Sequence, residues 1–275
     1  MAGRGMTRWV VAVPMAVLAL ATVYPLLFTA NVAVKTRREY VLDRFSPPGS
    51  WNWENIATAW TTAGVSRYFL NSAVVVTCSV ALLLLFGSMA GFALARLRFR
   101  GSSAVRLGCL AALFIPFQVI MVPLTRVMAD TGLVDTYPGL VLAYVAQFLP
   151  FTAFLMTSYY STVPPDIVDA ARIDGNTTYG VYWRIMLPMG APALISVGVL
   201  DALFCWNDVL IALLVMPSAD HRTLMVGVTS LRGQYSDDIP VFASGVLIAA
   251  VPVLAVYLLL QRRIADGVTA GATKG

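Results

Sequence analysis

The chain has 275 residues, of which 59% are hydrophobic and only 12% are charged, and its mean hydropathy is +0.76. A soluble protein of this length could not bury so much apolar surface in one core, so a bilayer must take it up. The net charge of +5 does not indicate a nucleic-acid partner, because the basic residues lie at the ends of apolar blocks and form no stripe with interleaved aromatic residues. The composition predicts an all-α, multi-pass membrane protein with a single transmembrane domain.

The residues that usually carry catalysis are scarce. His221 is the only histidine, so neither a zinc or copper site nor a Ser/His/Asp triad is indicated. Neither Lys35 nor Lys274 follows a glycine, which excludes a G-x-x-x-x-G-K-[ST] phosphate loop. The three cysteines fall inside apolar blocks, where we interpret them as small buried hydrophobes: Cys78, Cys109 and Cys205. We therefore expect no enzyme, and any nucleotide hydrolysis must come from a partner.

Six stretches reach the roughly 20 apolar residues that a membrane-spanning helix needs. They cover residues 9–34, 69–94, 107–124, 138–159, 192–215 and 241–260. The first is longer than the core of a signal peptide, so we interpret it as an uncleaved anchor. In the second, Gly87 and Gly91 form a G-x-x-x-G step, a common pattern that lets another helix backbone approach closely.

The basic residues suggest an orientation, because they favour the cytoplasmic side near short loops. Six spans place both termini on one side, and we expect that side to be cytoplasmic because it then holds the cluster Arg96, Arg98, Arg100 and Arg106. Four basic residues in the first outside loop oppose this assignment: Lys35, Arg37, Arg38 and Arg44. The outside loops 35–67 and 217–240 are candidate docking surfaces, although Trp51 and Trp53 could equally be interfacial anchors.

A polar loop, residues 161–188, separates the fourth and fifth spans and has the pattern of two short helices. Pro164 and Pro165 suit a first helical turn, and Gly175 can end that helix in a left-handed conformation. Residues 176–178 offer caps for a second helix through 182–187. The first helix contains four apolar residues at spacings that place several of them on one side: Ile167, Ala170, Ala171 and Ile173. Such a helix can enter a groove on a partner, lie on lipid headgroups or pack on its own bundle.

The same loop carries a family resemblance. Asp169-Ala-Ala-Arg-Ile-Asp174-Gly175, followed by Arg184-Ile-Met-Leu-Pro188, resembles the E-A-A-x-x-x-G signature of permease subunits in binding-protein-dependent, ATP-driven (ABC) importers. Asp169 stands where the family usually has Glu, which shortens the side chain by one methylene and keeps the carboxylate. We therefore expect docking with somewhat altered reach.

Further patterns are similar to the second, six-span subunit of the carbohydrate-importer branch, the maltose and glycerol-phosphate type. They are Tyr68-Phe-Leu-Asn71-Ser72, Gly91-Phe-Ala-Leu-Ala-Arg96-Leu-Arg-Phe-Arg-Gly101, Ile115-Pro-Phe-Gln118, Trp206-Asn207-Asp208 and the ending Gly267-Val-Thr-Ala-Gly271-Ala-Thr-Lys274-Gly275. Because these matches are separated and in the right order, the resemblance covers nearly the whole chain. It implies import of a sugar, oligosaccharide, polyol or sugar phosphate.

The resemblance also implies the partners. A paralogous permease subunit would complete the pore in a bacterial or archaeal cytoplasmic membrane, two copies of a cytoplasmic ATPase would bind ATP and Mg²⁺, and an extracytoplasmic solute-binding protein would deliver the substrate. The implied ATPase-coupling residues are Asp169, Ala170, Ala171, Arg172, Asp174, Gly175 and Pro188. The tail residues implied to reach the ATPase are Gly267, Gly271 and Lys274. The chain itself would hold no cofactor.

Polar residues inside the predicted spans are the candidates for the substrate pathway. An ionised carboxylate within a span costs roughly 2.5 to 3.5 kcal/mol on insertion scales, so Asp201 and Asp208 should face protein or water. Gln118 and Asn207 could hydrogen-bond sugar hydroxyls or, equally, join helices. Two rival functions stay open on these residues alone. One is a proton-coupled secondary transporter that uses Asp201 and Asp208, and the other is a scaffold that keeps the docking helix without transport.

Overall fold

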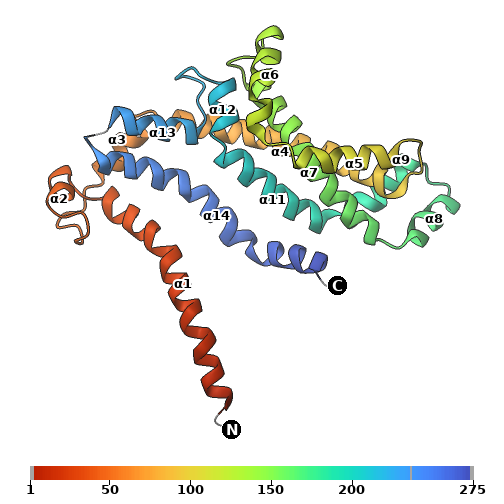
Figure 1. Ribbon diagram of the computed structural model, residues 1–275, viewed down its shortest axis with the longest axis horizontal. Helices are drawn as coiled ribbons and strands as arrows, with labels where there is room; N and C mark the ends of the chain where they lie inside the picture. The colour runs from red at the N-terminus through yellow and green to blue at the C-terminus, as the bar shows by residue number, and fades with distance from the viewer. Residues whose placement is uncertain (1–2, 236, 273–275) are drawn as a thin grey trace. The chain divides into compact units, whose positions relative to one another are not determined.

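A computed structural model describes residues 3–235 and 237–272, and within them all regular structure is helical. Figure 1 labels most of the helices. They are α1 (Gly3–Ala33), α2 (Arg37–Leu42), α3 (Glu54–Trp60), α4 (Val65–Arg96), α5 (Ser102–Leu113), α6 (Phe117–Asp130), α7 (Tyr137–Thr162), α8 (Pro165–Ile173), α9 (Thr178–Val181), the π-helix η1 (Tyr182–Met186), α10 (Leu187–Met189), α11 (Ala191–Asn207), α12 (Leu210–Val215), α13 (Leu224–Gln234) and α14 (Ile239–Ala272). The prediction of an all-α fold is confirmed.

Four helices are long and apolar enough to cross a membrane, and six spans result if each of two bent helix pairs counts as one. Contacts divide the chain into two compact units. One unit comprises Met1–Arg67 and Gly227–Pro252, and the other comprises Tyr68–Val226 and Val253–Gly275. Each unit has its own buried cluster.

The predicted third span, residues 107–124, is not one continuous helix. It consists of α5 and α6, which meet at an angle of 104°. Pro116 lies at the break in an extended conformation, with φ −61° and ψ 134°. Since proline lacks an amide hydrogen and keeps the preceding residue out of the helical region, the helix stops before Pro116 and restarts at Phe117.

The predicted fifth span, residues 192–215, is also interrupted. Helix α11 ends at Asn207, Asp208 is extended, and the short α12 follows. The second predicted helix of the polar loop, residues 182–187, is instead part of a longer helical stretch, Thr178–Met189, which meets α11 at 74°. The sequence pattern did not reveal that this stretch leads directly into the following span.

In the first unit, the end of α1 packs against α14. Val32 and Ala33 contact Ala243 in a buried cluster. The carbonyl of Ala33 accepts hydrogen bonds from Asn55 Nδ2 at 2.8 Å and from Ser244 Oγ at 3.2 Å. Side chains therefore satisfy a carbonyl that the end of a helix leaves without an intrahelical partner.

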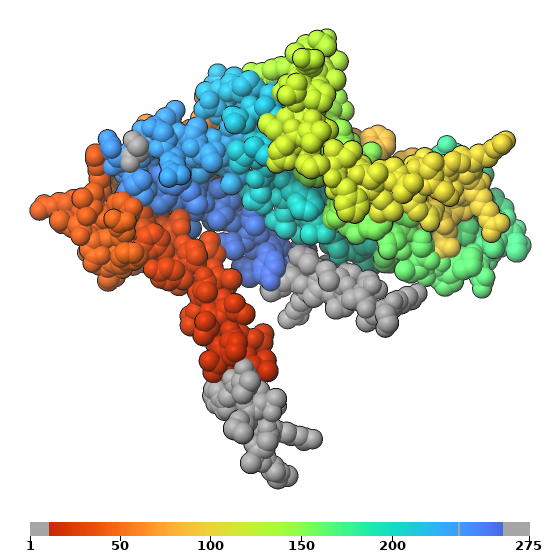
Figure 2. Space-filling view, in the orientation of Figure 1, coloured from red at the N-terminus to blue at the C-terminus, as the bar shows by residue number. Residues whose placement is uncertain are grey.

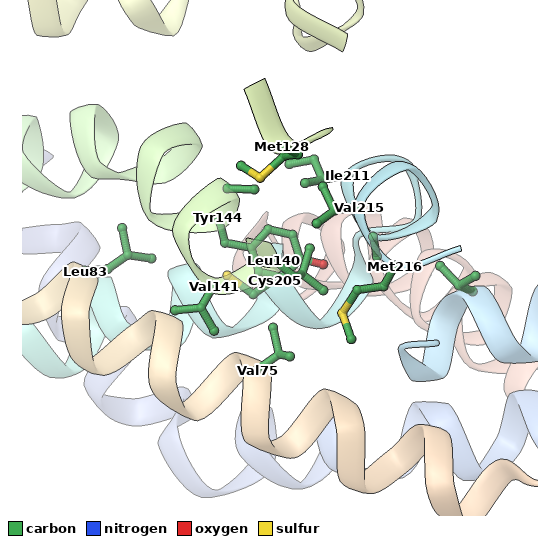
Figure 3. Close-up of a cluster of buried hydrophobic side chains, with 13 residues drawn as sticks. Val75, Leu83, Met128, Leu140, Val141, Tyr144, Cys205, Ile211, Val215 and Met216 are labelled. Carbon is green, nitrogen blue, oxygen red and sulfur yellow. The ribbon is translucent and has the colours of Figure 1, made fainter. Parts of the chain in front are cut away.

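In the second unit, a large apolar cluster joins α4, α6, α7, α11 and α12 with the start of α13 (Figure 3). The fully buried members include Val75 and Leu83 from α4 and Leu140 and Tyr144 from α7. Figure 3 shows Ile211 and Val215 of α12 turned toward this cluster. The broken end of the fifth predicted span is thus held by packing although its helix is interrupted.

Further along α4, the two glycines allow close contact with α7. A Cβ atom added at Gly87 would lie 2.5 Å from Cγ2 of Thr152, and one added at Gly91 would lie 2.6 Å from Cβ of Met156. The interpretation of G-x-x-x-G as a helix-approach step is confirmed. Here glycine is required by space and not by backbone conformation.

The turn between α6 and α7 is tied to the loop after α12. Asp135 Oδ1 accepts a hydrogen bond from the Ser218 amide at 3.2 Å, and Oδ2 lies 3.0 Å from Nδ1 of His221. Partial burial raises the pKa of Asp135, but the hydrogen bonds from Ser218 and His221 outweigh it, and the pKa lies below its ordinary value. The only histidine of the chain therefore joins two loops.

Candidate functional site

The clearest candidate site is α8, and its local sequence accounts for both of its ends. Pro165 occupies the first turn, where no amide hydrogen is needed. At the other end Gly175 has a φ of 82°, its amide donates to the Arg172 carbonyl, and the Asn176 amide donates to the Ala171 carbonyl, both at 3.0 Å. This pair of bonds is a Schellman motif. The predicted helix stop at Gly175 is confirmed.

One side of α8 is packed on its own chain. Val168 and Ala171 are buried, and Ile167 packs at the edge of the same cluster. The cluster also contains buried residues from α4, α7, η1 and α11: Phe92, Met156, Tyr160, Tyr182, Met186 and Val197. These contacts make α8 part of the second unit and not a mobile connection.

The opposite side of α8 is exposed. Ile173 keeps 87% of its surface accessible, and Asp169, Ala170 and Asp174 are exposed around it. The four apolar residues divide between two faces, because Ile167 and Ala171 pack on the bundle whereas Ala170 and Ile173 lie on the outer face. An exposed ion pair of 3.6 Å joins Asp169 to Arg172, and such a pair contributes little to stability.

Ile173 is a residue that sequence reasoning missed as part of the outer face. The signal was present, since Ala170 and Ile173 are three residues apart and so neighbour each other on a helix. An isolated isoleucine exposed to water is ordinary. An isoleucine beside Ala170 on a short, rigidly held helix is instead suited to contact another protein.

Three connections attach the α8 region to the bundle. The Arg96 guanidinium, at the end of α4, donates to the carbonyls of Tyr160 and Val163, just before α8. Tyr159 Oη donates to the Met189 carbonyl at 2.9 Å. Tyr182 Oη of η1 shares a 2.6 Å hydrogen bond with Ser88 Oγ of α4. A displacement of α8 would therefore act on α4, α7 and α11 together.

Arg96 has a structural role that the sequence did not reveal. In the sequence, Arg96 was used only as part of the basic cluster that indicates the cytoplasmic side. In the structure, its guanidinium donates to carbonyls at the end of α7. No local pattern predicts this bond, because it joins positions more than sixty residues apart.

After Gly175 the chain returns to the bundle through a second capped helix. Thr177 Oγ1 accepts from the Gly180 amide at 3.2 Å and so caps α9. Pro188 lies exposed in α10, just before the bend into α11. A Cβ atom added at Gly190 would lie 2.7 Å from Tyr160 Oη, so the bend packs tightly on α7.

Of the polar residues predicted along the pathway, Asp201 is fully buried. Its Oδ2 accepts a 2.9 Å hydrogen bond from Thr152 Oγ1 of α7, next to the α4 contact at Gly87. Its Oδ1 has no hydrogen-bond partner among the residues that the structure describes. The structure therefore places the side chain of Asp201, which belongs to α11, at the contact with α7.

Asp208 lies at the break between α11 and α12. Its Oδ2 accepts from the Ala212 amide at 2.9 Å and from Tyr144 Oη at 3.1 Å. It thus caps the first turn of α12. Asn207 and Gln118 are exposed, and the Asn207 side-chain amide donates to the Leu203 carbonyl of its own helix.

We expect Asp201→Asn to preserve both folding and substrate uptake, because its amide oxygen can still accept the bond from Thr152. Asp201→Leu removes the interhelical acceptor and leaves the buried Thr152 hydroxyl only the Phe148 carbonyl of its own helix, at 3.2 Å, so it should destabilise the fold by about 1 kcal/mol. Denaturation of the purified chain and uptake by vesicles measure both effects. A loss of uptake in Asp201→Asn at unchanged stability would show that ionisation itself is needed.

The C-terminal candidates are only partly described. Helix α14 continues through Gly267 and Gly271 to Ala272, and Lys274 lies outside the described residues. Within residues 3–235 and 237–272, no group of three or more His, Cys, Asp or Glu side chains could hold a metal ion.

Comparison with known proteins now decides the family. Residues 83–269 match the binding-protein-dependent transport system inner membrane component. This chain belongs to that family. The matched region contains α8, η1 and most of the bundle that holds them. The family consists of the membrane-embedded subunits of transport systems that also include an ATPase and a solute-binding protein, and these permease subunits are not themselves catalytic.

Several curated relatives match the permease over most of its length. The diacetylchitobiose uptake system permease protein NgcG of Streptomyces coelicolor is 36% identical, with 90% of this chain and 83% of that protein covered. The probable ABC transporter permease protein YurM of Bacillus subtilis is 34% identical, with 93% and 85% covered. The arabinooligosaccharides transport system permease protein AraQ of Halalkalibacterium halodurans is 32% identical, with 97% and 96% covered.

A solved structure shares the fold. It is the crystal structure of a bacterial ABC transporter involved in the import of the acidic polysaccharide alginate, and one of its chains matches with a TM-score of 0.84 at 20% identity. The alignment covers 95% of this chain and 98% of that chain. The fold predicted from the sequence is therefore confirmed. The family match and the curated relatives identify the chain as a pore-forming importer subunit. The comparisons do not favour the proton-coupled alternative.

Proposed function

We propose that this permease imports a carbohydrate and that α8 couples the pore to a separate cytoplasmic ATPase. The observation that carries the coupling proposal is the division of α8 into two faces. Val168 and Ala171 hold it on the bundle, while Asp169, Ala170 and Ile173 present a rigid, partly apolar outer face. The carbohydrate class rests on the relatives, whose names include uptake of diacetylchitobiose and arabinooligosaccharides.

In this proposal α8 acts as a lever. The small side chain of Ala170 lets a groove on the ATPase approach the helix closely, and Ile173 fills an apolar pocket there. Arg172, Asp174, Gly175 and Pro188 lie at the border of this contact. When ATP closes the ATPase dimer, the displacement of α8 passes through Tyr182 and the cluster beneath it to the membrane helices. Coupling is then a difference in contact free energy between two states of the pore.

The complete transporter would contain a paralogous permease subunit, two ATPase copies and an extracytoplasmic solute-binding protein. ATP and Mg²⁺ would be bound by the ATPase and not by this chain. Both termini would lie in the cytoplasm of a bacterial or archaeal cell, with the chain in its cytoplasmic membrane. The end of the chain, with Gly267, Gly271 and Lys274, would reach toward the ATPase.

For the substrate pathway, Gln118 and Asn207 are the stronger candidates because their side chains are exposed and amides match sugar hydroxyls. Asp201 and Asp208 have protein partners, Thr152 and Tyr144, that account for their burial. Their contribution to the pathway would be indirect, through the positions of α11 and α12.

An uptake assay that distinguishes ATP from a proton gradient as the energy source tests this function. Membrane vesicles that contain the whole transporter should take up labelled oligosaccharide when ATP is supplied on the ATPase side. Uptake should persist in the presence of a protonophore. Uptake that follows a proton gradient without ATP would refute the proposal.

Reversing the charge of Asp169 tests the outer face. Asp169→Lys should weaken ATPase binding by about tenfold or more, because a charge buried against an unsuitable partner costs several kcal/mol. Pull-down of the ATPase by the purified chain measures the effect. Asp130→Lys makes the same charge change at another exposed acid, at the end of α6, and should bind normally. Undiminished binding by Asp169→Lys would remove Asp169 from the interface.

A further inference from the structure

The segment 35–50, which follows α1 and contains α2, turns back onto the helix that precedes it; we call it the fold-back loop. The ring of Phe45 lies 5.6 Å from the ring of Phe28, and the Ser46 carbonyl accepts a 3.0 Å hydrogen bond from Asn31 Nδ2. Phe28 and Asn31 belong to the apolar span Val11–Ala33. At 1.5 Å per residue, Phe28 lies about 7.5 Å from the end of α1. The fold-back loop therefore lies beside the last turns of the apolar span and not beyond its end.

Internal hydrogen bonds fix the shape of the fold-back loop. Lys35 is fully buried, and its Nζ donates to the Asp43 carbonyl at 2.8 Å and to Ser46 Oγ at 3.2 Å. The Glu39 carboxylate accepts from the amides of Thr36 and Ser50, at 2.9 and 3.1 Å. The charged groups inside the loop are therefore used to hold it together.

The Asp43 carboxylate is used in the same way, because it accepts from the amides of Phe45 and Ser46. Both acidic side chains of the loop thus bind backbone groups, and neither forms an ion pair within the described residues. The arginines of the loop are exposed: Arg37, Arg38 and Arg44. The outer surface is consequently cationic.

The same surface is strongly apolar. Val41, Leu42 and Phe45 keep 74%, 75% and 69% of their surface exposed. Trp51 and Trp53 follow directly, with their rings stacked 5.8 Å apart, and the Asn52 amide between them donates to the Val34 carbonyl at the end of α1. Figure 2 shows the orange segment after α1 at the molecular surface.

We propose that the fold-back loop is a lipid-binding anchor that lies in the membrane interface beside α1. Val41, Leu42 and Phe45 enter the boundary between headgroups and acyl chains, and Arg37, Arg38 and Arg44 bind the phosphates of anionic phospholipids. Aromatic residues and arginines at the end of a span favour this boundary, and an apolar face with a cationic rim is typical of helices that lie in it. Continuity with the membrane-embedded surface of α1 favours lipid over a protein partner.

The anchor accounts for the basic residues that oppose the usual charge asymmetry. Four of them crowd this loop, and the structure divides their roles: Lys35 is internal, whereas the arginines face outward. Headgroup binding would set the depth of α1, whose side chains between residues 11 and 33 are buried against the unit only near the end of the helix.

A probe at Leu42 tests the proposal in the full chain. Cys78, Cys109 and Cys205 are replaced by serine or alanine, Leu42→Cys is labelled with an environment-sensitive fluorophore, and the protein is placed in nanodiscs of phosphatidylcholine and phosphatidylglycerol. We expect strong quenching by shallow spin-labelled lipids, weak quenching by aqueous iodide, and several-fold stronger quenching by labelled phosphatidylglycerol than by labelled phosphatidylcholine. A probe that iodide quenches freely would overturn the proposal, as would one that is shielded only after the paralogous permease or the solute-binding protein is added.

Two comparisons isolate the arginines. Arg37→Gln with Arg38→Gln should remove most of the several-fold preference for phosphatidylglycerol at the probe, so that the two labelled lipids quench almost equally. Arg98→Gln with Arg100→Gln, two exposed arginines between α4 and α5, should leave that preference unchanged. The labelled Leu42→Cys protein with its arginines intact can also be placed in nanodiscs that lack phosphatidylglycerol. Iodide should then quench the probe more strongly, which tests the same point without changing a charge. Equal quenching by both lipids in the wild-type loop would overturn the headgroup assignment.

Discussion

Gly175→Val is expected to abolish coupled transport while the permease remains in the membrane. The residue has a φ of 82°, a conformation that costs a β-branched side chain on the order of 1 to 3 kcal/mol. A Cβ atom at this position meets no other atom within 4 Å, so the strain comes from the backbone alone. The helix end would rearrange, and the outer face with Ala170 and Ile173 would lose its fixed position.

ATP-driven uptake and ATPase pull-down measure this effect, and we expect both to fall at least tenfold. Gly132→Val is the matched control, because Gly132 also has a left-handed φ, 68°, and open space around its Cβ position. It lies in the turn before α7, away from α8 in the sequence, and should retain ATPase binding. Gly175→Asn should retain much of the activity, since asparagine tolerates this conformation. Normal uptake by Gly175→Val would refute the role of the turn.

Gly91→Val is expected to prevent stable folding of the second unit. A Cβ atom at Gly91 would lie 2.6 Å from Cβ of Met156 and 2.9 Å from the Met156 carbonyl carbon and the Thr157 amide nitrogen. Two of these three atoms belong to the backbone of α7, which cannot rotate away as a side chain can. Overpacking of this kind costs about 1 to 3 kcal/mol even where side chains can adjust, so we expect a loss of about 3 kcal/mol or more.

Denaturation of the purified chain in detergent measures the loss. Gly91→Ala already introduces the clashing atom and should show a large part of the effect. Gly108→Val is the control, because Gly108 lies in α5 with no atom within 4 Å of its Cβ position, and its stability should change by less than about 1 kcal/mol. If Gly91→Val were as stable as Gly108→Val, the helices would not approach each other as closely as the structure shows.

Residue order alone determined the features that depend on near neighbours. The apolar blocks require a bilayer because nothing else can cover them, and the pattern from Pro165 to Gly175 specifies where α8 begins and ends. Prolines were harder to interpret. Pro14, Pro25 and Pro150 lie within continuous helices, whereas Pro116 accompanies a 104° bend. The same residue has both outcomes because neighbouring segments decide whether the freed carbonyl finds a partner.

Only the tertiary structure decided which face of α8 is free and what holds the other. Helical periodicity indicated that several apolar residues share a side. It could not show that Val168 and Ala171 pack against Tyr160 and its neighbours while Ala170 and Ile173 stay exposed. Likewise the sequence shows Asp201 only as a carboxylate within a span. The structure shows that it accepts a hydrogen bond from Thr152, forty-nine positions away. Local patterns fix helices through bonds between near neighbours, but the role of a side chain depends on atoms that folding brings from distant parts of the chain.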